Sequence, residues 1–74
     1  MKAFNVDLMV IKHPEIVVQL VGQDGNVFNL MGIVANALRK NGFGEEVQEF
    51  ITDVTSSQSY HEVLAVMMRW VDVR

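Results

Sequence analysis

The segment IVVQLVGQDGNVF, residues 16–28, changes from a β-branched run to a glycine-containing turn and then enters a helical pattern. The run from Ile16 to Val21 predicts a strand, because β-branched side chains favour extended backbone. Residues 22–26 interrupt the run with two glycines and an asparagine, which are typical turn residues. The segment therefore predicts a strand followed by a tight turn and a helix.

A second strand is predicted before this segment, over residues 3–11. Apolar Phe4, Val6, Leu8 and Val10 alternate there with Asn5 and Asp7, and a period of two is the signature of a strand. Residues 12–15 predict a turn, because Pro14 lacks an amide and restricts the residue before it. We therefore expect residues 3–11 and 16–21 to pair as a two-stranded antiparallel ribbon.

Three helices are expected after the ribbon. The first runs from about Val27 to Lys40, with Asn26 as its N-cap and Asn41-Gly42 as its stop. The second runs from Glu45 to about Val54, where apolar residues recur at helical spacing. The third follows Ser59, which forms a capping-box pattern with Glu62. The closing residues 70–73 alternate in polarity, so they can form a short final strand.

The fold class expected is therefore α+β, in a single small domain over residues 1–74. A chain of 74 residues buries only about 60% of the surface that its unfolded form exposes, less than larger domains bury. It also has no cysteine for disulfide bonds. Hydrophobic residues nevertheless make up 50% of the chain. Because one small core cannot hide so many apolar side chains, we expect a homo-oligomer or a partner-binding face.

The charge balance excludes some classes of partner. The net charge is −3, with nine acidic and six basic residues, and the only adjacent basic pair is Arg39-Lys40. Nucleic-acid binders usually cluster Lys and Arg, so no nucleic-acid partner is expected. The apolar runs are too short to span a bilayer, and the first residues do not resemble a signal peptide. We therefore expect a cytoplasmic protein without a membrane partner.

The turn at residues 22–26 has two interpretations. Free amides at a helix N-terminus can hold a small anionic ligand, such as a nucleotide phosphate, and Arg39-Lys40 could add positive charge. The turn matches neither the G-x-G-x-x-G motif nor the Walker motif, and Asp24 would repel an anion. A simple turn and helix cap is therefore the favoured interpretation. Because about 20 Å of helix separates Asn26 from Arg39, any anion would have to bind between two subunits. The candidate ligand-binding residues are Gly22, Asp24, Gly25, Asn26, Arg39 and Lys40.

No catalytic residue, metal ligand or cofactor is predicted. His13 and His61 are far apart in sequence and do not form a metal-binding pair on one helix face. Ser56, Ser57 and Ser59 lack a nucleophile-elbow sequence and are explained by loops and helix caps. We therefore expect that the protein is not an enzyme.

Other groups of side chains suggest contacts with a protein partner. Glu45, Glu46, Glu49 and Asp53 form an acidic face on the second helix, which could recruit a basic partner or be merely solvated. Trp70 and Met67 are expected in the core, whereas Met68 lies off the apolar stripe of its helix. Ile33 lies among polar residues of the first helix. The candidate partner-binding residues are Ile33, Asn36 and Met68.

From Val18 to Val73 the chain resembles a group of short, largely uncharacterised bacterial and bacteriophage proteins. The residues that carry the resemblance are the segment LVGxDGNxF over residues 20–28, Gly32, Ala37-Leu38-Arg39, Gly42, Thr55-Ser56, Tyr60-His61, Leu64 and Trp70-Val71-x-Val73. The chain departs from the group before the third helix, where it lacks the Ser-Gly-Asp-Tyr sequence. The resemblance implies a cytoplasmic protein of bacterial or phage origin, and it implies no activity.

These observations predict a small non-catalytic binding protein that occupies or sequesters a partner and associates with itself. If the protein is phage-encoded, the partner would be a host protein that it inhibits. The alternative is a protein that binds a small anionic ligand between subunits.

Overall fold

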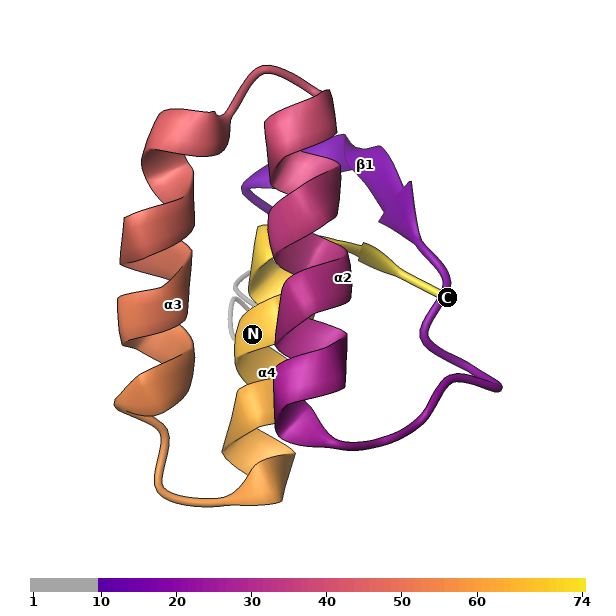
Figure 1. Cartoon of the computed structure of the whole chain (residues 1–74), viewed down its shortest axis with the longest axis vertical. Helices are drawn as coiled ribbons and strands as arrows, with labels where there is room; N and C mark the ends of the chain where they lie inside the picture. Colours follow the sequence, from indigo (N-terminus) through magenta and orange to yellow (C-terminus); the bar gives the residue numbers. More distant parts are fainter. Residues whose placement is uncertain (1–9) are drawn as a thin grey trace, which may run out of the picture.

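Two short strands flank three helices along the chain. In the computed structural model, which describes residues 10–74, the elements are β1 (His13–Val18), α2 (Val27–Lys40), the 3-10 helix η1 (Gly44–Glu46), α3 (Val47–Thr55), α4 (Tyr60–Trp70) and β2 (Val71–Val73). Figure 1 shows α2 and α3 side by side, α4 behind them, and the two strands together at one side of the helices.

The two strands form a parallel sheet, so the predicted antiparallel ribbon is wrong. Val17 of β1 lies beside Asp72 of β2, and Val18 lies beside Val73. Of the strand predicted over residues 3–11, residues 3–9 lie outside the described part of the chain, and Val10 and Ile11 are not in a strand. Parallel strands require a long crossover, and here all three helices form that crossover.

The bounds of β1 also differ from the prediction. The strand spans His13–Val18 instead of residues 16–21, and most of the predicted turn at residues 12–15 belongs to it. His13 pairs with Val71 and Val17 pairs with the next residue, Asp72, so residues 14–16 form a bulge. A proline is tolerated at such a bulge because its missing amide removes no regular ladder bond. The predicted C-terminal strand is confirmed as β2.

The first helix has the predicted bounds. The side chain of Asn26 accepts a hydrogen bond from the Phe28 amide at 2.8 Å, which confirms Asn26 as the N-cap. After Lys40 the chain turns through Gly42, whose φ of 89° lies in the left-handed region that favours glycine. The second predicted helix begins as the 3-10 helix η1 at Gly44 and continues as α3 to Thr55.

Ser59 is the N-cap of α4, as predicted, and its hydroxyl accepts from the Glu62 amide at 3.1 Å. The reciprocal bond differs from the predicted capping box, because the Glu62 carboxylate accepts from the Gln58 amide instead of the Ser59 amide. The helix ends at Trp70, and Val71 has extended backbone angles. The chain therefore passes directly from α4 into β2.

The core lies where the helices pack on the sheet. Its largest fully buried side chains come from α2, α3, α4 and β2; they are Phe50, Leu38, Met67, Val34 and Val71. Phe50 packs edge-on against the indole of Trp70, with the ring centroids 5.6 Å apart. Burying each of these side chains contributes about 1.5–3 kcal/mol. Because every major element supplies part of the core, the position of the sheet depends on the packing of all three helices.

The cap of α4 gives a direct test of this description. Ser59→Ala should lower the free energy of unfolding by about 1 kcal/mol, because it leaves the Glu62 amide without its partner. Ser57→Ala is the control, since the Ser57 hydroxyl donates only to the exposed Asp53 carbonyl at the end of α3. Urea denaturation measures both, and equal losses would show that α4 does not begin at Tyr60.

Candidate functional site

A groove of about 610 Å³ lies between β1 and the C-terminal half of α2. We call it the β1 groove. Its walls are residues 15–19 on the strand side and Ile33, Asn36, Ala37, Lys40 and Asn41 on the helix side. Ile33 and Asn36 were predicted to bind a partner and Lys40 to bind an anion, and the fold brings all three to this one groove.

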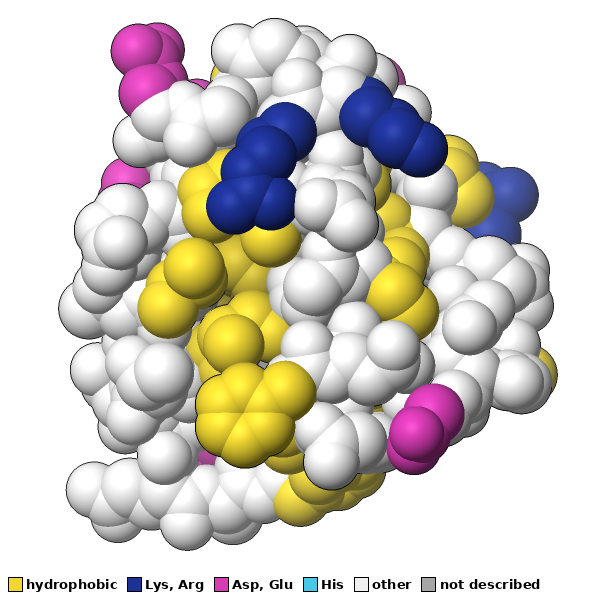
Figure 2. Space-filling model, viewed as in Figure 1, with side chains coloured by type: hydrophobic (Ala, Val, Ile, Leu, Met, Phe, Trp, Pro, Cys, Tyr) yellow, Lys and Arg dark blue, Asp and Glu magenta, His cyan; other side chains and the backbone are white. Residues whose placement is uncertain are grey.

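The helix wall of the groove is a single stripe of α2. Asn36 and Ala37 lie three and four residues after Ile33, and Lys40 lies three residues after Ala37. These spacings place the four residues on one side of the helix. Ile33 and Ala37 are half-buried, whereas Asn36 and Lys40 are exposed. Figure 2 shows hydrophobic side chains on both sides of α2, and basic side chains near its C-terminal end. The wall is therefore apolar in its middle and positively charged at one end.

The strand wall of the groove presents backbone groups. Val18 C=O accepts from the Arg74 amide at 2.7 Å, and the Leu20 amide donates to Arg74 C=O at 2.6 Å. Alternate residues of a strand direct their N–H and C=O groups to opposite edges. Val17 and Gln19 therefore direct theirs away from β2, which is the only strand that pairs with β1 within residues 10–74. No β2 residue lines the groove, so the groove lies at this outward edge.

The outer face of the sheet is also partly open to solvent. Val17 is 52% exposed, whereas its neighbours Ile16 and Val18 face the helices and are buried. Parallel sheets usually have both faces covered, because their strands are apolar on both sides. An exposed valine on a parallel strand is therefore typical of a surface that another molecule covers.

The third predicted partner-binding residue, Met68, lies elsewhere. It is 57% exposed and lines an apolar hollow of about 310 Å³ among the end of β1, the start of α2, α4 and β2. Tyr60 lines the same hollow, and its hydroxyl donates to the Gly25 carbonyl at 2.8 Å. The hollow has few polar groups that could orient a ligand.

The predicted anion site is not assembled within one chain. Asp24 accepts from the Asn26 amide at 3.1 Å, and Asn26 accepts from the Phe28 amide at 2.8 Å, so the residues of the turn already use these amides. Arg39 and Lys40 lie in the last turn of α2, at the opposite end of the helix from the turn. Gly22, Gly25 and the rest of the turn are exposed. The structure shows the residues acting as a turn and a helix cap.

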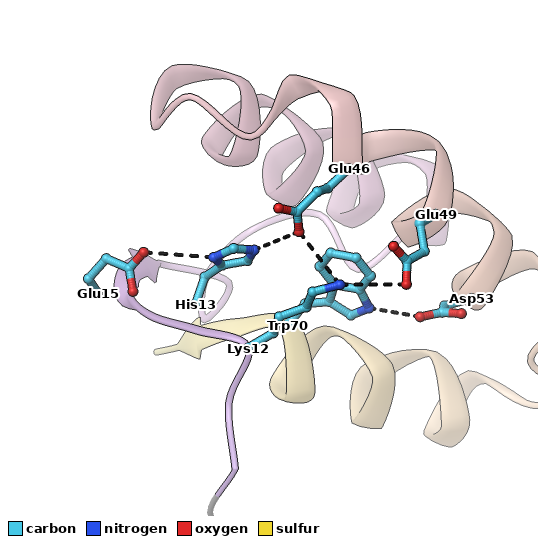
Figure 3. Close-up of polar contacts among 7 residues, drawn as sticks. All are labelled: Lys12, His13, Glu15, Glu46, Glu49, Asp53 and Trp70. Carbon is cyan, nitrogen blue, oxygen red and sulfur yellow. Dashed lines mark hydrogen bonds and ion pairs between the residues drawn. The ribbon is translucent and has the colours of Figure 1, made fainter.

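A polar cluster that the sequence did not indicate lies on the other side of the strand, where β1 begins (Figure 3). His13, which is 7% exposed, stacks on Phe43 with ring centroids 4.0 Å apart. Its Nε2–H donates to Glu46 Oε1 at 2.8 Å, and its Nδ1 lies 3.7 Å from a Glu15 oxygen. Trp70 Nε1–H donates to Asp53 Oδ2 at 2.9 Å. The residues drawn in Figure 3 are called the His13 cluster; they are Lys12, His13, Glu15, Glu46, Glu49, Asp53 and Trp70.

Lys12 completes the cluster. Its Nζ lies 3.6 Å from Glu46 Oε1, 3.5 Å from Glu49 Oε2 and 4.1 Å from the centre of the Trp70 ring. The amide of Lys12 also donates to the Arg69 carbonyl at the end of α4, at 2.8 Å. These contacts connect residues at the start of β1 to residues of η1, α3 and α4. We interpret the cluster as structural.

The acidic face predicted on the second helix is thus only partly solvated. Glu46, Glu49 and Asp53 recur at spacings of three and four residues and form one stripe toward Lys12, His13 and Trp70. Of the four acids only Glu46 is half-buried, and the other three are exposed. The spacing of the three acids was a usable signal. The spacing did not indicate His13 as a partner of these acids, because the sequence predicts that His13 lies in a turn.

The serines that were considered as nucleophiles lie between the end of α3 and the N-cap of α4. Ser56 and Ser57 line a polar hollow between α3 and α4 together with Asp53, Glu62 and Arg69, and His61 is not among its residues. The Ser57 hydroxyl donates to a backbone carbonyl. Within residues 10–74 no group of three potential metal ligands occurs.

Comparisons with protein-family models, with curated protein sequences and with solved structures gave no match to this chain. Within the part of the chain that the structure describes, no helix is both long enough and apolar enough to cross a membrane. The site must therefore be interpreted from its own geometry.

The His13 cluster predicts an acid-sensitive contribution to stability. The hydrogen bond from His13 is the main cause that holds the pKa of Glu46 below its ordinary value, and the charge of Lys12 adds to it, while partial burial acts in the opposite direction. A carboxyl with a lowered folded pKa stabilises the protein above its unfolded pKa, about 4.3, and this contribution disappears as the pH falls through the folded pKa.

Glu46→Gln should therefore lower the free energy of unfolding at pH 7, and the difference from wild type should shrink below about pH 4. Urea denaturation between pH 3 and pH 7 measures this difference. Glu45→Gln is the matched control, because Glu45 is an exposed neighbour outside the cluster. A difference for Glu46→Gln that stays constant over the whole range would contradict the pairing with His13.

Proposed function

We propose that this protein is a small non-catalytic binding protein that takes up an extended segment of a protein partner in the β1 groove. The segment adds to the sheet as a strand, with its backbone bonded to Val17 and Gln19. The observation that carries the proposal is the outward edge of β1, which faces a groove closed on its other side by α2.

Strand addition is a common way to bind an extended peptide. The edge of a sheet supplies backbone hydrogen bonds, and the adjoining surface supplies pockets for alternate side chains of the peptide. In the β1 groove these surfaces are Ile33 and Ala37 for an apolar side chain and Lys40 for an acidic or polar one. The combination of a strand edge and a helix wall suits an extended peptide better than a compact ligand.

The available edge is short, which limits the length of the bound segment. Pro14 and the bulge at residues 14–16 disrupt the first half of β1, and the charged side chain of Glu15 protects it further. Prolines, bulges and charges are the features by which natural proteins prevent unwanted pairing at sheet edges. Only Val17 to Leu20 remain as a regular edge, so two outward residues form the docking surface.

A binding protein of this kind can act as an inhibitor without any chemistry. Occupying an extended segment of a partner prevents that segment from binding anything else, which fits the sequestering role expected from the sequence. The anionic-ligand alternative gains no support, because side chains of the turn already accept hydrogen bonds from the Asn26 and Phe28 amides.

The proposal can be tested with random linear peptides displayed on a library and selected against the full chain. Selected peptides should protect the amides of Val17 and Gln19 from hydrogen exchange. Val17→Pro should weaken binding by about tenfold, since it removes an outward donor, whereas Val17→Ala keeps the amide and should have little effect.

Two controls accompany the peptide measurement. Circular dichroism must show that the proline variant is folded, which is expected because the Val17 amide makes no bond to β2. Phe28→Ala removes an exposed aromatic outside the groove and should leave binding unchanged. Failure to select any peptide, or binding that Val17→Pro leaves intact, would overturn the proposed function.

A further inference from the structure

We infer that a second copy of this chain occupies the β1 groove when no other partner is present, so that two β1 strands pair antiparallel across a two-fold axis at Val18. This inference rests on the proposed function, because it uses the same outward edge. The resulting sheet has four strands in the order β2-β1-β1-β2, with the helices of both copies on one face.

The register follows from which backbone groups of β1 point away from β2. In an antiparallel pair, two residues that face each other across a hydrogen-bonded position exchange both N–H and C=O bonds. An outward residue must therefore face an outward residue of the other copy. With the axis at Val18, Val17 faces Gln19 of the second copy and Gln19 faces its Val17, which satisfies all the outward groups of both strands.

Other registers leave the outward backbone groups of β1 with poorer partners. A shift by one residue would place outward residues opposite residues that already bond to β2. A two-fold axis at Val17 would bring Glu15 and the bulge into the ladder, and an axis at Gln19 would engage Val21, whose amide already donates to Arg74. The axis at Val18 alone uses the regular part of the edge.

The side chains in this register are compatible on both faces of the sheet. On the face toward the helices, Val18 faces Val18 of the second copy and Ile16 faces its Leu20, so every such pair is apolar. On the outer face, Val17 faces Gln19 of the second copy. No like charges lie opposite each other, which would be destabilising in a sheet. The edge is therefore self-complementary, as a two-fold interface requires.

The pairing also covers surface that a single chain leaves open. Val17 and Val21 are 52% and 75% exposed. A sheet of two short strands is marginal by itself, and additional strands stabilise it. The α2 stripes of the two copies come together beside the axis, so Ile33 and Ala37, which are half-buried in one chain, gain further cover. This accounts for part of the apolar surplus in the composition.

The absence of cysteine from the chain permits a sharp test of the register. Val17→Cys and Gln19→Cys are prepared as separate proteins and then oxidised, alone and as an equal mixture. Residues facing each other at a hydrogen-bonded position have Cα atoms about 5.5 Å apart, within the range that a disulfide spans. The mixture should form a covalent dimer rapidly, and each protein alone should form one much more slowly.

Sedimentation of the unmodified chain, over roughly 1 to 200 µM, gives the second measurement. Wild type should approach twice the 8.4 kDa mass of one chain, and Val17→Pro should remain monomeric. The amides of Val17 and Gln19 should be protected from hydrogen exchange only at the high concentrations. Met68→Glu is the control for the apolar hollow, and it should leave the dimer intact.

The remaining outcomes separate this inference from the proposed function. A chain that stays monomeric but binds selected peptides through Val17 overturns the inference and leaves the proposed function in place. A dimer that Met68→Glu dissolves and Val17→Pro does not would mean that the copies associate through the apolar hollow, which also overturns the inference. Amides of Val17 and Gln19 that are protected at every concentration would show an edge covered within one chain, which overturns both.

Discussion

The parallel pairing of β1 with β2 is the contact on which the arrangement of the described chain depends. It brings residues near the start of that chain beside its last residues, and the three helices span the whole distance between them. Val71 of β2 is fully buried, so the short strand is fixed by side-chain packing as well as by its ladder. Because β2 follows Trp70 without a loop, the end of α4 sets the position of the sheet.

Trp70 links this sheet to the polar cluster beside it. Its ring packs against Phe50 in the core and lies under the Lys12 ammonium, and its N–H donates to Asp53. A buried indole N–H is costly without an acceptor, so Asp53 also fixes the rotation of the ring. Ion pairs as exposed as those of Lys12 are individually weak. The main effect of the His13 cluster is therefore to fix where β1 begins. Its contribution to the free energy of unfolding is the lesser effect.

The same pairing explains why β1 has an outward edge. A parallel strand that bonds to β2 on one side must present its alternate backbone groups on the other, and the crossover helices pack on one face of the sheet. In this chain α2 runs beside that second edge without covering its backbone. The bulge at residues 14–16 disrupts the first half of the strand, which confines the regular outward edge to a few residues. The groove is thus a consequence of the topology.

The sequence by itself determined the helices, their caps and the short strand after α4. Asn26, Ser59 and Gly42 act through neighbours within a few residues, and the helical stripes are local patterns, so these features follow from local chemistry. The sequence also placed Ile33, Asn36 and Met68 on partly or fully exposed helix surface, although it could not show that the first two share a groove.

Only the tertiary structure decided which strands pair. Alternation over residues 3–11 suggested a hairpin with the next β-branched run, but β1 instead pairs with residues more than fifty positions later. Sequence periodicity reports which face of a strand is apolar, and it contains no information about the partner of that strand. The role of His13 was missed for the same reason, because its neighbours Phe43, Glu46 and Trp70 come from distant elements. The outward direction of Val17 and Gln19 likewise follows from the position of β2, which packing of the helices fixes.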